Sequence, residues 1–207
     1  MTVEAPSWIP RFRLREILVA ALLAVLAAGV GAGYVLRQTP VYQSAAQLLI
    51  DQPGPIFSAS DVGLLDKLVA LRLKYLGIIH TALIADPVAE TLKLPKGFVL
   101  GSLAGAFERT SLLMSVVAHT SQPALTQKIA QAGAEELVKY VQNELDTYKV
   151  PPEKRFFFKI VTPAGPGRKI SPTRNRALTF GAAGGLTALA LALILQRLIA
   201  VSRRPAA

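Results

Sequence analysis

Two uncharged runs, one near each end of the chain, dominate its pattern of hydrophobic and polar residues. The first is Ile17–Leu36, and the second begins at Ala177 and ends at Leu195. Each is about as long as the ~20 residues that a helix needs to cross a ~30 Å hydrocarbon core. The pattern therefore predicts membrane helices at 17–36 and 177–196. They leave a central segment, 37–176, large enough to bury a core of its own.

A cleavable signal peptide is the alternative interpretation of the first run. The residues before it are basic, and small residues cluster at Ala27, Ala28 and Gly29. A signal core usually spans about 7–15 residues, however, which is shorter than this run. We therefore expect an uncleaved helix.

Three stretches of the central segment alternate between apolar and polar residues, as half-buried strands do. They are 40–51, 109–120 and 156–162. The first strand follows one membrane helix directly, and the third leads back to the other. We therefore expect these two strands to be antiparallel neighbours.

Helical spacing of apolar residues predicts the helices of the central segment. The first runs from a cap at Ser60 or Asp61 to Ile79, and the next covers 81–94 with a fresh start at Pro87. The longest begins near Ser121 and ends near Asp146. The glycines of 101–105 indicate a loop. The whole order predicts an α+β fold, a small domain with helices on one face of a mixed three- or four-stranded sheet.

A proline- and glycine-rich stretch, 163–172, separates the third strand from the second membrane helix. Its prolines limit φ and should stiffen this elbow, whereas its glycines should allow the chain to turn. We expect the elbow to hold the central domain in a defined orientation on the membrane. The residues concerned are Pro163, Pro166 and Pro172, with Gly165 and Gly167.

Gly181 and Gly185 lie four residues apart in the second membrane helix. Small residues at this spacing allow the backbones of two helices to approach closely. We predict such a packing contact, with the ordinary glycine content of membrane helices as the alternative explanation.

The net charge of +10 does not gather into one basic face. Basic residues flank the two runs on the side of the chain termini: Arg11, Arg13, Arg15, Arg197, Arg203 and Arg204. Because cytoplasmic flanks of membrane helices are rich in Lys and Arg, tails 1–16 and 197–207 are predicted to be cytoplasmic and the central domain extracytoplasmic. Arg37, Arg174 and Arg176 on the outer side oppose this prediction, but long loops translocate largely regardless of charge.

Four basic residues bracket the elbow: Arg168, Lys169, Arg174 and Arg176. They are candidates for contact with lipid headgroups, with an anionic glycan or with a polymer partner. Nucleic acid is not an expected partner, because no basic face is interleaved with stacking aromatics.

The sequence shows no set of residues that suits catalysis, a cofactor or a metal ion. The chain has no cysteine, which excludes thiolate chemistry and disulfides. His80 and His119 are far apart in sequence and lack a second ligand at helical spacing. Glu144 and Asp146 fit the solvated face of the long helix, with contacts to a neighbouring subunit as the alternative. We expect no enzyme activity.

Four features, in this order, resemble the Wzz-type chain-length determinants, or polysaccharide co-polymerases. Residues 40–46, PVYQSAA, resemble the strand after that family's first span. Residues 110–117 followed by Ser-Gln-Pro-Ala at 121–124 resemble its second strand and "DPxxA" helix, with Gln122 in place of the usual Asp. The segment from Val161 to Pro172 and the glycine-rich start of the second run resemble its proline-rich segment and second span.

The resemblance covers roughly residues 8–200 and implies a short form of the family, like the membrane adaptors of capsule tyrosine kinases. It implies a two-pass protein of the bacterial inner or plasma membrane that oligomerises around a polysaccharide polymerase and the growing glycan, and thereby sets chain length or export of a capsule, exopolysaccharide or O-antigen. Two alternatives are open. One is an adaptor that activates a cytoplasmic tyrosine kinase, and the other is a membrane sensor or accessory protein unrelated to glycans.

Overall fold

The computed structural model of the protein describes residues 14–51, 62–107 and 113–202. The chain divides into two compact units. One consists of its two ends, Met1–Thr39 and Pro172–Ala207, and the other is Pro40–Ser171. The domain predicted at 37–176 thus corresponds to a unit that is a few residues shorter at each end. We call the two parts the helical unit and the central domain.

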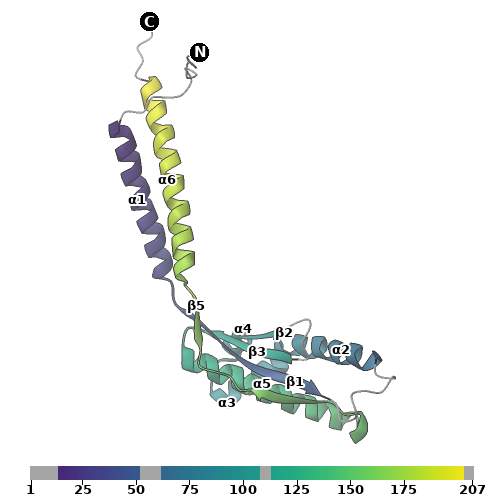
Figure 1. The fold of residues 1–207 in the computed structure, drawn as a ribbon. Coiled ribbons are helices and arrows are strands. Elements are labelled where there is room, and N and C mark those ends of the chain that lie inside the picture. Colours follow the sequence, from purple (N-terminus) through teal and green to yellow (C-terminus); the bar gives the residue numbers. More distant parts are fainter. Residues whose placement is uncertain (1–13, 52–61, 108–112, 203–207) are drawn as a thin grey trace. The chain divides into compact units, whose positions relative to one another are not determined.

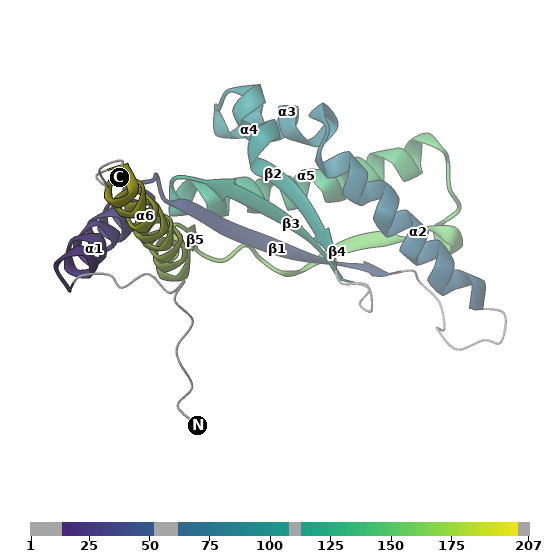
Figure 2. The same ribbon diagram turned by 90° about the horizontal axis from the view of Figure 1, so that it is seen from above.

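The helical unit contains two long helices, α1 (Leu14–Leu36) and α6 (Arg174–Ser202), which lie side by side (Figures 1 and 2). Ile17–Leu36 and Arg174–Ile199 are long and apolar enough to cross a membrane. Their large apolar side chains are mostly exposed, as in helices whose solvent is lipid. Both predicted helices are present and are long and apolar enough to span a membrane, and the second is longer than 177–196.

Glycines bring the backbones of α1 and α6 together. A Cβ atom added at Gly181 would lie 3.0 Å from the carbonyl oxygen of Ala28, and one added at Gly185 would lie 3.1 Å from that of Ala24. On α1, a Cβ at Gly31 would lie 3.1 Å from the carbonyl oxygen of Phe180. Larger side chains at these positions would therefore push the helices apart.

We predict that Gly185→Leu separates α1 from α6, whereas Gly33→Leu, at a glycine with nothing within 4 Å of an added Cβ, does not. Because the chain has no cysteine, the separation can be read by disulfide formation between Ala32→Cys and Gly181→Cys, whose Cβ atoms would lie 3.3 Å apart. Gly185→Leu should abolish most of this cross-link. Equal cross-linking in both leucine variants would contradict the packing described.

The central domain is built on a five-stranded sheet in which every hydrogen-bonded pair is antiparallel. The strands lie in the order β2-β3-β1-β4, and β5 also pairs with β1 (Figure 2). Their bounds are β1 Val41–Asp51, β2 Leu103–Phe107, β3 Leu113–Thr120, β4 Phe157–Thr162 and β5 Arg168–Ser171. The antiparallel pairing of the first and last predicted strands, now β1 and β4, is confirmed.

The predicted mixed sheet is wrong, although the α+β class is confirmed. A helix between two strands favours a parallel pair, and β3 and β4, joined by the long helix, do run in the same direction. They lie on opposite sides of β1, however, and each is antiparallel to it. The parallel strands are therefore never neighbours.

Helices cover one face of this sheet, as predicted. They are α2 (Val62–Ile79), α3 (Ala82–Leu92), α4 (Lys96–Ser102) and α5 (Pro123–Thr147), followed by a short 3-10 turn at Pro152–Lys154. A Cβ at Gly133 of α5 would meet Val116 of β3, and one at Gly105 of β2 would meet Leu76 of α2. Because Gly105 and Val116 are paired across β2 and β3, α2 and α5 lie on the same face.

The core lies between these helices and the sheet. Alternate β1 residues Ala46, Leu48 and Ile50 are buried, as are their neighbours on β3. From the helices, the buried side chains include Tyr75, Ile84, Val88, Ile129, Leu137 and Val141.

Two local predictions in the central domain are wrong. Helix α3 does not start at Pro87 but contains it, because Thr81 already provides the extended residue before the first turn. Residues 101–105, predicted as a loop, form the end of α4 and the start of β2. The small residues of β2 carry little strand signal, so this edge strand depends on pairing with β3 and on α2 packing over Gly105. The predicted caps Ser60 and Asp61, and the start of the strand predicted from 109, lie outside the described residues.

Candidate functional site

The segment that joins β4 to β5, Pro163–Gly167, is held in place by side chains from two other elements. Ser44 of β1 donates a hydrogen bond from Oγ to the carbonyl oxygen of Gly165, at 2.6 Å. From α5, Gln127 donates to the carbonyl oxygen of Ala164 at 2.8 Å, and Gln131 accepts from its N–H at 2.9 Å. Two glutamines one helical turn apart thus bind both polar groups of one peptide residue, as a neighbouring strand would. The predicted elbow is anchored through its backbone.

The two glycines of this segment do not serve the turn in the predicted way. Neither has a φ in the left-handed region, so conformational freedom is not what they provide. A Cβ at Gly165 would meet nothing within 4 Å. At Gly167, it would lie 2.8 Å from both the Cα and the carbonyl oxygen of Pro123, the first residue of α5. Glycine is needed at 167 because the segment crosses the backbone of α5 there.

The three predicted elbow prolines are divided between the units. Pro163 and Pro166 lie in the segment before β5, in the central domain, while Pro172 belongs to the helical unit just before α6. The predicted elbow also contains a strand, β5, which the sequence did not indicate. Its four residues, Arg168–Ser171, pair with β1 rather than forming a free turn.

The change of partner along β1 leaves a gap in the sheet. On one side of β1, residues 47–51 pair with β4 and residues 41–43 pair with β5. Among the described residues, no strand pairs with Ser44, Ala45 or Ala46 on that side. Since alternate residues of a strand direct their N–H and C=O groups to opposite sides, at least one of these residues directs its backbone groups into the gap.

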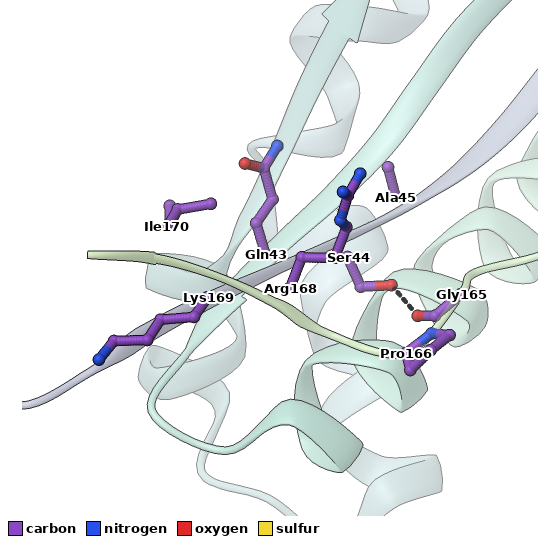
Figure 3. Close-up of a pocket in the computed structure, with 8 residues that line it drawn as sticks. All are labelled: Gln43, Ser44, Ala45, Gly165, Pro166, Arg168, Lys169 and Ile170. Carbon is purple, nitrogen blue, oxygen red and sulfur yellow. Dashed lines mark hydrogen bonds between the residues drawn. The ribbon is translucent and has the colours of Figure 1, made fainter. Parts of the chain in front are cut away.

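A pocket of about 500 Å³ lies at this gap, and we call it the ladder-gap pocket (Figure 3). Gln43, Ser44 and Ala45 of β1 form one side, and Gly165, Pro166, Arg168, Lys169 and Ile170 form the other. Arg168 reaches over β1 between the side chains of Gln43 and Ala45, whereas Lys169 points away (Figure 3). The volume is within the range typical of small-molecule sites.

The ladder-gap pocket is basic. Its lining includes Arg168 and Lys169 and no acidic residue. In the part of the chain that the structure describes, neither cation has a carboxylate within ion-pair distance. The other predicted contact residues, Arg174 and Arg176, are in the first turn of α6 in the helical unit, where the Arg176 guanidinium lies 5.8 Å from the ring centre of Phe180.

A second groove, of about 580 Å³, lies where α3, α5 and the β4–β5 segment meet. Its walls are mostly small or apolar, with the glutamine pair Gln127 and Gln131 at the base of the segment. Among the described residues, no group of three or more His, Asp or Glu is placed to hold a metal ion. His80 accepts a hydrogen bond from the N–H of Gly105 at 3.3 Å, and His119 faces Gln43 across β1 and β3.

Glu144 was predicted to lie on a solvated face of the long helix, and this prediction is wrong. Its side chain joins α5 to α2. Its side chain is 15% exposed. It accepts a hydrogen bond from the hydroxyl of Tyr75 at 2.6 Å and forms an ion pair with Lys74. The sequence could not show this, because α2 and α5 are far apart along the chain. Asp146 is 64% exposed and pairs with Arg155 at 2.7 Å.

The Glu144 cluster should make the domain acid-sensitive. Burial opposes ionisation of Glu144, but the hydrogen bonds from Lys74 and Tyr75 outweigh it and lower the pKa of the carboxyl below 4.5. Because the folded state has the lower pKa, its stabilisation is complete above about pH 4.5 and is lost as the pH falls through the folded value.

We expect Glu144→Gln to remove part of this loss of stability in acid, as measured by urea unfolding of the full chain in micelles between neutral and acidic pH. Glu135→Gln, at an exposed position on the same helix, is the control and should leave the pH profile unchanged. The same pH profile in Glu144→Gln and the unmodified protein would contradict the role of this cluster.

No family model matches the chain, and a search of curated proteins also finds no match. The functional conclusion therefore depends on the resemblance of the motifs, on the architecture and on the chemistry of the ladder-gap pocket.

Proposed function

We propose that this protein is a membrane scaffold that sets the chain length, or supports the export, of a bacterial surface polysaccharide. In this proposal it resides in the inner or plasma membrane with both termini in the cytoplasm. The central domain is extracytoplasmic and oligomerises around the polymerase and the growing glycan. The protein acts by binding and makes no bond itself.

The observation that carries the proposal is the way in which the central domain is linked to two membrane helices. Only residues 37–40 separate α1 from β1, and only Pro172 and Thr173 separate β5 from α6. The two strands that carry these links, β1 and β5, pair with each other. Both attachment points therefore belong to one hydrogen-bonded ladder, which supports a scaffold whose domain is joined to its two helices through neighbouring strands.

The order of elements supports the same proposal. A membrane helix, a strand, helices, a strand, a long helix beginning at Pro123, a strand and a proline-rich segment follow one another before the second membrane helix. This is the order on which the resemblance to polysaccharide co-polymerases depends. The arginine-rich tails support the proposed sidedness, since such flanks are typically cytoplasmic.

Deletion of the gene tests the proposal. We expect the length distribution of the surface polysaccharide, resolved by gel electrophoresis, to change in the deletion strain and to return with the full-length protein. An unchanged distribution would contradict the scaffold function. The mass of the protein in lipid nanodiscs tests the assembly separately, because a monomer there would contradict a scaffold of several subunits.

A truncated chain distinguishes the scaffold proposal from the kinase-adaptor alternative. A chain that ends at Gln196 keeps the central domain and α6 as far as that residue but lacks the cytoplasmic tail. The scaffold proposal expects this chain to preserve the polysaccharide length distribution. Loss of tyrosine phosphorylation in a cytoplasmic kinase, with glycan length unchanged even in the full deletion, would favour the adaptor instead.

A further inference from the structure

The ladder-gap pocket has hydrogen-bonding groups that the fold leaves without a strand partner. Between the β4 and β5 ladders, Ser44–Ala46 face an opening instead of a neighbouring strand. Ser44 uses its hydroxyl to hold Gly165 across the opening. Ser44 and Ala45 line the pocket, so a ligand at the opening would lie against the part of β1 that neither β4 nor β5 covers.

Arg168 provides the charge at this opening. It lies opposite Gln43 in the β1–β5 register, so both side chains leave the sheet on the same face, the one without helices. Lys169 points the other way (Figure 3). The guanidinium of Arg168 presents a planar fork of donors that matches the two oxygens of a carboxylate or phosphate.

The walls of the pocket are held in place before any ligand arrives. The Gly165 side is fixed by Ser44, and Ala164 next to it is fixed by Gln127 and Gln131. A site whose walls are already ordered loses less conformational entropy on binding. The residues that line the pocket include no carboxylate that would repel an anion.

We propose that the ladder-gap pocket binds an oxyanion, a carboxylate or phosphate group, through the side chains of Arg168 and Gln43, beside the part of β1 that neither β4 nor β5 covers. The inference rests on the proposed function in one respect, namely that the oxyanion belongs to a repeating unit of the glycan. The same chemistry would also recognise the phosphate of a lipid headgroup, and the experiment separates the two sources.

The test uses the full chain in nanodiscs of zwitterionic lipid and isothermal titration calorimetry. The probes are an oligosaccharide of hexuronic acids, a neutral oligosaccharide of the same length, and glycerol 3-phosphate as a soluble headgroup. We expect one of the anionic probes to bind saturably and the neutral one to bind at least about tenfold more weakly, as the loss of a charged hydrogen bond predicts. Tighter binding of the uronic acid oligosaccharide assigns the site to the glycan, and tighter binding of glycerol 3-phosphate assigns it to lipid.

Three variants establish where the anion binds. Arg168→Gln should weaken binding at least about tenfold, and Arg168→Lys should weaken it less, because the charge is kept but the fork is lost. The control is Lys159→Gln, which removes an exposed cation from the same sheet outside the pocket and should bind normally. Matching circular dichroism spectra show that the variants are folded.

The proposal is overturned if no anionic probe binds, if Arg168→Gln binds as tightly as the unmodified protein, or if Lys159→Gln weakens binding equally. These outcomes differ from failure of the proposed function. A deletion strain with altered glycan length and a pocket that binds nothing would refute the anion site alone. An unchanged glycan length with Arg168-dependent binding would refute the scaffold function alone.

Discussion

Replacing Tyr75 with alanine is expected to lower the free energy of unfolding of the central domain by about 3–5 kcal/mol, the range for removing a buried aromatic side chain. Tyr75 is 1% exposed. Its ring lies 5.8 Å from that of Phe156 and 5.2 Å from that of Phe158, between ring centres, and its hydroxyl donates to Glu144. One residue of α2 thus contacts both the end of the sheet and α5, so its loss leaves a cavity and removes a hydrogen bond to the partly buried Glu144.

The size of this effect can be divided between ring and hydroxyl. Tyr75→Phe keeps the ring and should cost only about 1.5–3 kcal/mol, the net value of one hydrogen bond to a charged group. Tyr148→Ala, at a side chain that is 73% exposed, is the control and should change stability by no more than about 0.5 kcal/mol. Urea unfolding of the full chain in micelles, followed by circular dichroism, gives these values. Equal costs for Tyr75→Ala and Tyr148→Ala would show that α2 does not pack as described.

The second large effect is expected at Gly167, where alanine should destabilise the central domain by about 1–3 kcal/mol, the usual cost of inserting a methyl group into a filled space. Its Cβ would lie 2.8 Å from two backbone atoms of Pro123. Backbone cannot rotate away as a side chain can, so the segment must lift off α5. We expect β5 and the ladder-gap pocket to be disturbed with it, because Arg168 is the next residue.

Gly165→Ala is the matched control in the same segment. An added Cβ there has open space around it, and its φ is not left-handed. Alanine should therefore be neutral or stabilise by about 0.4–1 kcal/mol, because it restricts the unfolded chain. The same unfolding measurement applies, with anion binding as a second readout for Gly167→Ala. If both glycines tolerate alanine equally, Gly167 is not in close contact with α5.

Together these variants separate the two features on which the proposed scaffold depends. Tyr75 lies in the core that keeps α2 on the sheet, whereas Gly167 belongs to the segment that returns the chain from β4 to α6. If the proposed function holds, Gly167→Ala should change the polysaccharide length distribution even where the protein stays folded. The change should be larger than that caused by a Tyr75 variant of equal stability.

Elements with a strong local pattern were predicted well. The pattern of apolar residues is clear over many positions in five elements. It is continuous in the two apolar runs, alternates in β1 and β4, and has helical spacing in α5. Such a period reports which side chains are buried, independently of the partner that buries them. The α+β class and the antiparallel pairing of β1 with β4 followed from the order of these elements.

The errors have a common cause, which is that the deciding contact lies far away in sequence. β2 and β5 are short and lack an apolar alternation, so they become strands only by pairing with β3 and β1. The sheet is antiparallel throughout because β1 inserts between β3 and β4. Glu144 appears solvated in a helical pattern and becomes partly buried only when α2 supplies Lys74 and Tyr75.

The sequence by itself determined that this protein has two membrane-spanning candidates and a separate domain between them, because hydropathy and periodicity are local properties of the chain. It also identified Arg168 and the proline-rich segment as functional candidates. Only the tertiary structure decided that this segment is fastened by Ser44, Gln127 and Gln131, and that Arg168 stands at a break in the β1 ladder. The pocket is formed by residues that are far apart in sequence. It exists because β1 pairs with both β4 and β5, which the composition of the chain does not reveal.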